Sequence, residues 1–176
     1  MKARSRGLAP LLFAALLAAC GGSDNTTGPA IPESLDTCTV FTPEQARTMS
    51  GSPVAILSST MEDASETRNR LQCTYNAGTM EAPRLLSLEY RPAPSARVAG
   101  SRMKSGRSYL RTLSKSEVRD VPGLGDEAMW AGGDVQQLHA RKGAVQIVVT
   151  MQTGGDALAK ARQVAAQAID RLSPPS

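Results

Sequence analysis

The sequence of 176 residues is poor in the residue types from which most catalytic and metal centres are built. It contains one histidine, His139, and three cysteines, Cys20, Cys38 and Cys73. Structural zinc sites take four cysteine or histidine ligands, and Cys38, Cys73 and one histidine do not supply them. We therefore expect no metal site.

The motifs that identify common enzyme classes are absent as well. There is no Gly-x-Ser-x-Gly elbow of the serine hydrolases. The glycine-rich loops that hold dinucleotides or phosphates are missing, and so is the acidic spacing of an EF-hand. We expect no cofactor, and we predict that the chain is not an enzyme.

The longest apolar run covers residues 8–19 and follows the basic residues Lys2, Arg4 and Arg6. A spanning helix needs about 20 apolar residues, so this run is too short for a permanent anchor. A basic start, a short apolar stretch and small residues at its end are typical of an export signal. We predict that residues 1–19 are a signal peptide.

The end of that segment, Leu17-Ala18-Ala19-Cys20, resembles the lipobox of bacterial lipoproteins. The resemblance implies cleavage before Cys20 and a diacylglyceryl group on its sulfur, and hence a membrane-anchored protein of the cell envelope. Ordinary secretion with a free Cys20 is the alternative. Residues 20–34 are rich in glycine, serine, threonine and proline, which favours a flexible tether outside the cytoplasm.

The net charge of +4 does not indicate a nucleic-acid partner. Three of the 20 basic residues lie in the signal, which leaves 17 against 16 acidic residues in the mature chain. An exported protein meets an oxidising compartment, where the two remaining cysteines favour a Cys38–Cys73 disulfide.

The rest of the chain, residues 35–173, predicts a single α+β domain with three helices on a mainly antiparallel sheet of about five to six strands. Helices are expected at residues 43–50, 95–113 and 157–172. Strands are expected at residues 54–57, 71–75, 86–91 and 128–131, and in a hairpin at residues 135–141 and 144–151. Residues 61–69 are expected to form a loop, and residues 118–125 a turn-rich connection.

The order of these motifs resembles a group of small bacterial lipoproteins of unknown function. The residues that carry the resemblance are Cys38 with the following Thr-Pro-Glu-Gln-Ala segment, Leu71-Gln72-Cys73-Thr74-Tyr75, and Val121-Pro122-Gly123-Leu124-Gly125-Asp126-Glu127-Ala128. The resemblance implies a two-cysteine α+β envelope domain and supplies no catalytic residues.

Four residues are considered for a catalytic or binding role: Asp126, Glu127, His139 and Trp130. Asp126 and Glu127 are adjacent acids, but neighbours on a strand point to opposite faces, which disfavours a shared site. Asp126 is expected to close a turn instead. His139 falls on the polar face of its strand, where a structural or exposed role is favoured over catalysis. Trp130 is either a core residue, which is favoured, or a ligand-stacking platform.

The best interaction candidate is the helix at residues 95–113. Its apolar residues gather on one side, and basic residues gather on the other: Arg97, Lys104, Arg107, Arg111 and Lys115. Such a face would attract an anionic lipid surface or an acidic envelope partner. An ordinary solvated face is the alternative.

We therefore predict a lipid-anchored, non-enzymatic envelope domain that binds or scaffolds another envelope component. One alternative is a carrier of a small apolar ligand in a closed pocket between helix and sheet. A hydrolase using Asp126, Glu127 or His139 is a second, and it requires these side chains to converge.

Overall fold

The computed structural model describes residues 29–57, 71–113, 118–134 and 136–172. The predicted signal, Cys20, the first part of the predicted tether, the predicted loop at residues 61–69 and Lys115 lie outside these ranges.

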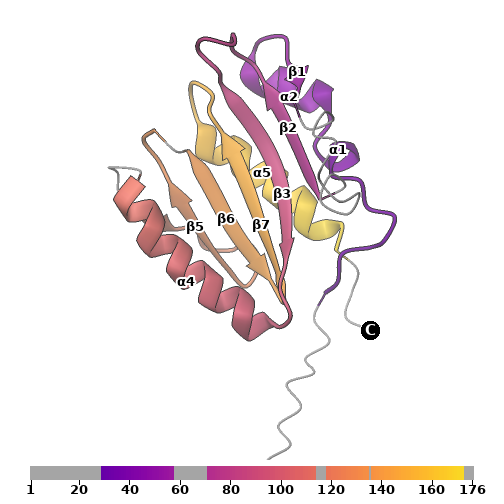
Figure 1. Cartoon of the computed structure of the whole chain (residues 1–176), viewed down its shortest axis with the longest axis vertical. Coiled ribbons are helices and arrows are strands. Elements are labelled where there is room, and N and C mark those ends of the chain that lie inside the picture. Colours follow the sequence, from indigo (N-terminus) through magenta and orange to yellow (C-terminus); the bar gives the residue numbers. More distant parts are fainter. Residues whose placement is uncertain (1–28, 58–70, 114–117, 135, 173–176) are drawn as a thin grey trace, which may run out of the picture.

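A single antiparallel sheet forms the centre of the described domain (Figure 1). Its seven strands follow the order β1-β2-β3-β7-β6-β5-β4. Strands β1 to β3 form one half of the sheet and β4 to β7 form the other, and the two halves join where β7 pairs with β3. The strands are β1 (Ala55–Ile56), β2 (Gln72–Asn76), β3 (Leu85–Pro92), β4 (Val118–Asp120), β5 (Glu127–Ala131), β6 (Gln137–Lys142) and β7 (Val145–Met151).

The predicted α+β class is confirmed, but the predicted strand count is wrong. The additional strand is β4, which lies in the segment expected to be a turn-rich connection. Its three residues pair with β5, with Val118 opposite Ala131. A segment this short carries too little alternation to mark a strand, so only its pairing partner defines it.

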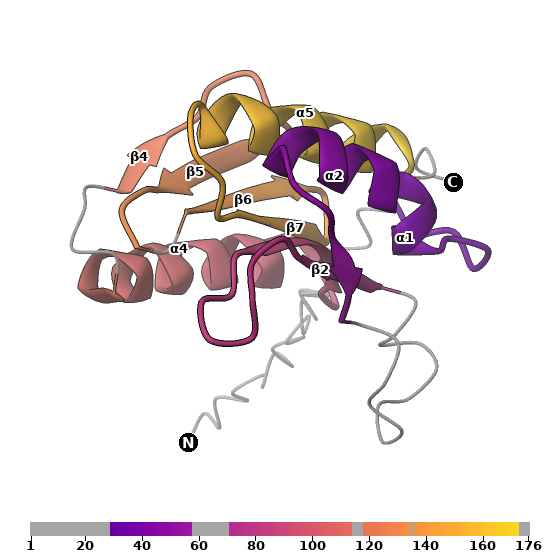
Figure 2. The same cartoon turned by 90° about the horizontal axis from the view of Figure 1, so that it is seen from above.

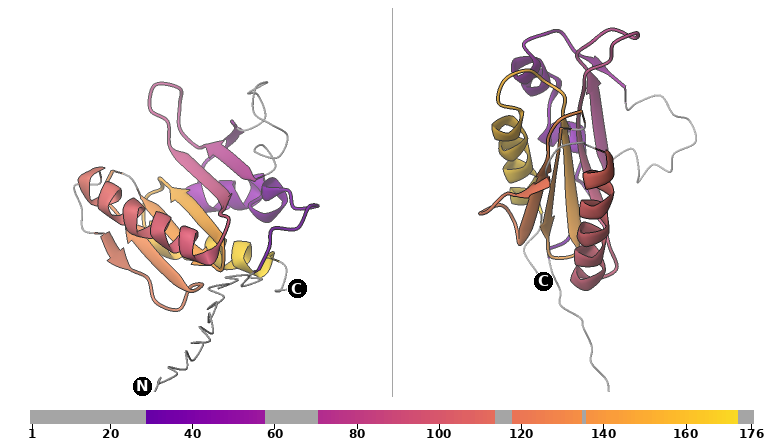
Figure 3. Two further views of the ribbon diagram at one scale, coloured as in Figure 1. Left: turned by 60° about the horizontal axis from the view of Figure 1, so that its bottom comes forward. Right: turned by 90° about the vertical axis from the view of Figure 1, so that its left-hand side faces the viewer.

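Helices cover both faces of the sheet. They are α1 (Thr37–Val40), α2 (Pro43–Ser50), α4 (Ala96–Leu113) and α5 (Ala157–Asp170). Figure 2 and the right-hand view of Figure 3 show α2 and α5 on one side of the sheet and α4 on the other. The described part thus has four helices where three were predicted, because the four-residue α1 precedes α2.

The helix ends follow from local chemistry. Thr42 and Gln45 form the capping box of α2, in which each side chain accepts a hydrogen bond from the other's backbone N–H. Gly51 ends α2 in the left-handed conformation. Asp156 caps α5 by accepting a hydrogen bond from Ala159 N–H.

The main core lies between the sheet and the layer of α1, α2 and α5. Alternate residues of β7, among them Ile147 and Val149, pack there against Val164 of α5. Ile31, within the predicted tether, is partly buried against the same core. The predicted disulfide is confirmed: Cys38 of α1 is bonded to the fully buried Cys73 of β2.

A second, much smaller apolar cluster lies under α4. It consists of five buried residues: Met103, Leu110, Val118, Met129 and Ala131. Apart from this cluster and the buried Val148, β6 and β7 present mainly polar side chains to α4: Gln137, His139, Arg141, Gln146 and Thr150.

Candidate functional site

The helix α4 is the most strongly charged element of the described domain. Its 18 residues include four arginines and one lysine and no acidic residue. Ala99, Met103 and Leu110 are buried against the sheet, so the helix presents the remainder of its circumference outwards. The view on the left of Figure 3 shows this outward side along its whole length.

Three of the predicted binding residues form one line on the exposed surface of α4. Arg97, Lys104 and Arg111 are all exposed. Each follows the previous one by seven residues, which returns the side chain to nearly the same side of a helix after two turns. None of the three makes an ion pair with the residues that the structure describes. These cations are therefore available to an external anion.

Arg107 does not belong to this line, which corrects the predicted set. It lies half-buried at the edge of the helix, where its guanidinium forms an ion pair with Asp120 of β4. Arg107 therefore fastens α4 to the edge strand. The sequence did not reveal this contact because β4 was not recognised as a strand. Lys115 lies outside the described residues.

Two apolar side chains of α4 are exposed. Tyr109 is 64% exposed and Leu113 is 45% exposed. At about 100° per residue they lie on the side of the helix away from Arg97, Lys104 and Arg111, with the exposed Arg102 between them. The exposed surface of α4 therefore has a basic side and a mixed side. The apolar residues that gather on one side of this helix in the sequence are thus only partly buried.

Beneath α4 lies a hydrogen-bonded row of polar side chains on β6 and β7. His139, only 6% exposed, contacts Gln137 through Nε2 at 3.2 Å and Gln146 through Nδ1 at 3.1 Å. Gln137 also donates to Thr150 Oγ1, and Gln146 Nε2 lies 3.3 Å from the sulfur of Met103 on α4. The predicted polar face of His139 is confirmed, and it is a buried face.

Burial, and to a smaller extent the positive charge of Arg91, together lower the pKa of His139 to about 4. The ring is therefore neutral at pH 7. Its hydrogen bonds go to amides rather than to a carboxylate or a nucleophile, so it lacks the partners of a catalytic histidine within the described part of the chain.

Asp126 and Glu127 converge on one arginine, contrary to the expectation from strand geometry. Arg141 Nη1 donates to Asp126 Oδ2 at 3.0 Å, and Arg141 Nε donates to Glu127 Oε1 at 2.7 Å. The long Arg141 side chain reaches both carboxylates because Asp126 precedes β5 rather than lying within it.

Asp126 closes the hairpin between β6 and β7 with its side chain, and not the Gly123-Leu124-Gly125 turn that it was expected to close through its backbone. Its Oδ2 accepts a hydrogen bond from Gly143 N–H at 2.7 Å. Burial alone would raise its pKa, but this hydrogen bond and the charges of Lys142 and Arg141 hold the pKa below its ordinary value. Both acids are thus engaged in structural contacts.

Trp130 faces the main core, where it is 7% exposed. A nearby surface pocket of about 180 Å³ is lined by residues 120–128 and does not include it. The position supports the structural reading of Trp130 over that of a stacking platform.

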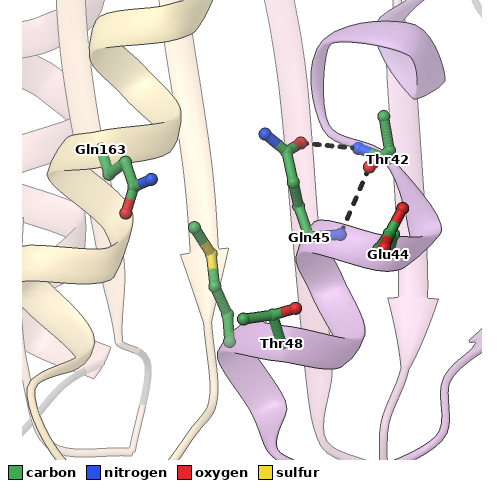
Figure 4. A pocket seen from close by; sticks show the side chains of 6 residues that line it. Thr42, Glu44, Gln45, Thr48 and Gln163 are labelled. Carbon is green, nitrogen blue, oxygen red and sulfur yellow. Dashed lines mark hydrogen bonds between the residues drawn. The ribbon is translucent and has the colours of Figure 1, made fainter.

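Two surface grooves lie along the seam between α2 and α5, and Figure 4 shows the side chains that line one of them. That groove has a volume of about 230 Å³ and the other about 430 Å³, and both include Gln45, which donates to Gln167 across the seam at 3.1 Å. Thr48 and Gln163 line the first, and Asp170 and Arg171 line the second. Both grooves are open, the first with a mixed lining and the second with a mainly polar one, unlike the closed apolar pocket that a carrier of an apolar ligand requires.

The described residues contain no group of three or more histidine, cysteine or acidic side chains suited to a metal ion. None of their helices has the length and apolarity to cross a bilayer.

A scan against protein-family models finds no match, and a search of curated proteins finds no significant relative.

Proposed function

We propose that this chain is a lipid-anchored protein of the cell envelope whose domain acts as a non-enzymatic binding module, with α4 as the surface that meets an anionic partner. The observation that carries the proposal is the line of Arg97, Lys104 and Arg111, exposed and without ion pairs among the described residues. The engagement of Asp126, Glu127 and His139 in structural contacts supports a binding role over hydrolysis.

An anionic lipid surface is the partner that best fits a linear set of cations on an anchored domain. Each lysine or arginine close to such a surface contributes about 1 kcal/mol. A single acyl chain gives only marginal attachment, whereas two chains hold a protein stably. A diacylglyceryl group on Cys20 would supply both chains, and the basic side of α4 would then orient the anchored domain against the surface.

The surface is tested with the mature chain carrying Cys20→Ser, so that binding does not depend on the lipid. We measure its binding to vesicles of phosphatidylcholine with and without 30% phosphatidylglycerol, at low and high salt. The triple variant Arg97→Glu/Lys104→Glu/Arg111→Glu is expected to bind the anionic vesicles roughly 100-fold more weakly, since three contributions of about 1 kcal/mol are lost.

A matched control places the same change in charge away from α4. The variant Arg47→Glu/Arg119→Glu/Arg162→Glu alters exposed arginines of α2, β4 and α5 and should bind as the unsubstituted protein does. Equal losses in both variants would show that net charge alone matters. Binding that ignores salt and lipid charge would rule out the surface.

The anchor is tested separately by mass spectrometry of the protein isolated from its own envelope. We expect a chain that begins at Cys20 and carries acyl chains on that residue. An unmodified Cys20 would refute the lipid anchor.

A further inference from the structure

The hydrogen-bond partners of His139 indicate which of its two ring nitrogens carries a proton. Gln137 Oε1 only accepts hydrogen bonds, so His139 Nε2 must carry the proton at their 3.2 Å contact. Gln146 Nε2 only donates, so His139 Nδ1 must be an unprotonated acceptor. This network therefore accommodates the neutral imidazole alone.

The same network reaches α4. The amide nitrogen of Gln146 that donates to His139 also contacts Met103 Sδ, and Met103 is buried in the small cluster under the helix. A proton on Nδ1 would place one N–H against another and force the amide of Gln146 to turn. That rotation would break the contact with Met103, so a change on the ring is transmitted directly to the helix.

Among the described residues, the carboxylates near His139 are already paired, so none is free to stabilise a positive charge on its ring. On the sheet face under α4, β3 supplies Glu89 and Arg91, which pair with each other, and Arg141 of β6 is held by Glu127 of β5 and Asp126. β7 supplies only the uncharged Gln146, Val148 and Thr150. From α4 and β4 come Arg107 and Asp120, also paired. Every nearby carboxylate is engaged by an arginine.

Little else holds α4 to the sheet. Its apolar contacts are few: the five-residue cluster under the helix, together with the buried Ala99 of α4 and Val148 of β7 on the same face. The Arg107–Asp120 pair is largely exposed on the aspartate side, and Arg102 donates to the backbone oxygen of Pro92 at 2.9 Å. Elements with so few buried contacts open at lower free energy than the whole domain unfolds.

From this geometry we infer that α4 is an acid-releasable element: protonation of the buried His139 disrupts the Gln146–Met103 contact and frees the helix from the sheet. The released helix carries Ala99, Met103 and Leu110 on one side and Arg97, Lys104 and Arg111 on another. Such an amphipathic helix lies in the interface of an anionic bilayer with its apolar side buried. Its use at a membrane rests on the proposed function, whereas the release itself does not.

The size of the effect follows from the two protonation states of the ring. His139 has a pKa of about 4 in place and regains its ordinary value of 6.5 when α4 opens. Lowering the pH from 7.5 to 5.0 should then favour the open form by about 30-fold. Ordinary carboxylates remain largely charged at pH 5.0, so this window isolates the histidine.

The release is tested by hydrogen–deuterium exchange of the mature Cys20→Ser chain without vesicles, at pH 7.5 and 5.0, with intrinsic exchange rates corrected for pH. Protection of the α4 amides should fall by about 30-fold at pH 5.0 and should lie well below that of the α5 amides at both pH values, because α4 opens without global unfolding. In His139→Gln, which keeps a neutral polar side chain, the protection of α4 should not depend on pH. An unchanged α4, or an equal fall in the variant, overturns the inference.

A second measurement keeps the test independent of whether the variant folds. His139 is the only histidine, so its proton resonance in the unsubstituted chain is unambiguous. We expect it to titrate well below pH 6.5, with α4 amide shifts following the same midpoint. A midpoint at 6.5 overturns the inference.

Vesicle binding separates this inference from the proposed function. Binding to anionic vesicles at pH 7.5 judges the function, whereas exchange of α4 without vesicles judges the release. If α4 responds to pH but the chain ignores anionic vesicles, the function is wrong and the release stands. If α4 does not respond, the release is wrong whatever the vesicles show.

Discussion

Gly125 is a residue at which the backbone leaves no room for a side chain. Its φ is +64°, and a Cβ atom there would lie 2.3 Å from the carbonyl oxygen of Arg141. That close approach brings Asp126 to the hairpin it closes. Gly123 has a similar φ of +74° but no atom within 4 Å of an added Cβ. Comparing the two positions therefore separates the cost of a positive φ, which both share, from the cost of a steric clash, which only Gly125 would meet.

We expect Gly125→Ala to lower the free energy of unfolding by about 3–4 kcal/mol, because strain and a backbone clash add together. Gly123→Ala serves as the control and should lose only about 1–2 kcal/mol from strain. Urea denaturation of both variants measures the difference. Equal losses would contradict the close approach of Gly125 to Arg141.

His139 makes the stability of the domain dependent on pH. Because the folded state lowers its pKa from 6.5 to about 4, the unfolded chain binds the proton more readily between these values. Its contribution is complete above pH 6.5 and is lost as the pH falls towards 4. One pKa unit corresponds to about 1.4 kcal/mol, so the full loss is about 3 kcal/mol.

We expect the free energies of global unfolding of the unsubstituted chain and of His139→Gln to diverge as the pH is lowered. Between pH 7.5 and 5.0 the unsubstituted protein should lose about 2 kcal/mol more than the variant, as measured by urea denaturation. Parallel pH curves for the two proteins would contradict the lowered pKa. Strand alternation placed His139 on the polar face, but only the packing of α4 buried it.

Among the elements, α4 and α5 are both amphipathic helices but differ in how they are held. α5 buries Ala157, Ala161, Val164, Ala165 and Ala168 in the main core, and Tyr90 donates a hydrogen bond to the carbonyl of Ala168 at 3.0 Å. The small alanines let α5 approach the sheet closely. α4 instead rests on a polar face through few apolar contacts.

We expect Leu110→Ala to weaken amide protection in α4 by roughly 2 kcal/mol or more at pH 7.5, because a large part of its small apolar cluster disappears. Protection in α5 should fall by a similar amount, because the substitution also lowers the free energy of global unfolding. Val164→Ala is the matched control in the main core and should weaken protection in α5 while leaving that of α4 nearly unchanged, because α4 opens with the main core intact. Hydrogen exchange measures both, and an equal loss in α4 and α5 of Val164→Ala would show that α4 does not open separately.

The elements also show where sequence patterns suffice. The helices expected at residues 43–50 and 157–172 are found close to those positions as α2 and α5, because the signals for them are local. β4 escaped prediction because its three residues form a strand only beside β5. The exposure of Tyr109 depended on which side of α4 met the sheet, and no periodicity decides between neighbouring orientations of one helix.

At the scale of the whole molecule, the Cys38–Cys73 bond ties the first helix to the central sheet. It closes a loop with a sequence separation of 35 residues, which includes α2 and β1. Restricting the unfolded chain in this way contributes about 4 kcal/mol in the chain-entropy estimate.

Reduction of the disulfide is therefore expected to lower the unfolding free energy of the mature Cys20→Ser chain by about 4 kcal/mol. Urea denaturation with and without a reductant measures the effect. The double variant Cys38→Ser/Cys73→Ser should match the reduced protein and should not respond to the reductant. A midpoint unaffected by reduction would show that the bond does not contribute to stability.

The sequence alone determined the α+β class, the cysteine pairing and most helices and strands, because these depend on local periodicity, capping and the count of residue types. It also marked α4 as the basic helix. Only the tertiary structure decided that Arg107 is paired, that Tyr109 is exposed and that the two acids share Arg141. It alone placed His139 between two amides beneath α4. Those outcomes depend on distances between segments far apart in the chain, and such distances are set when the two layers of helices pack on the sheet.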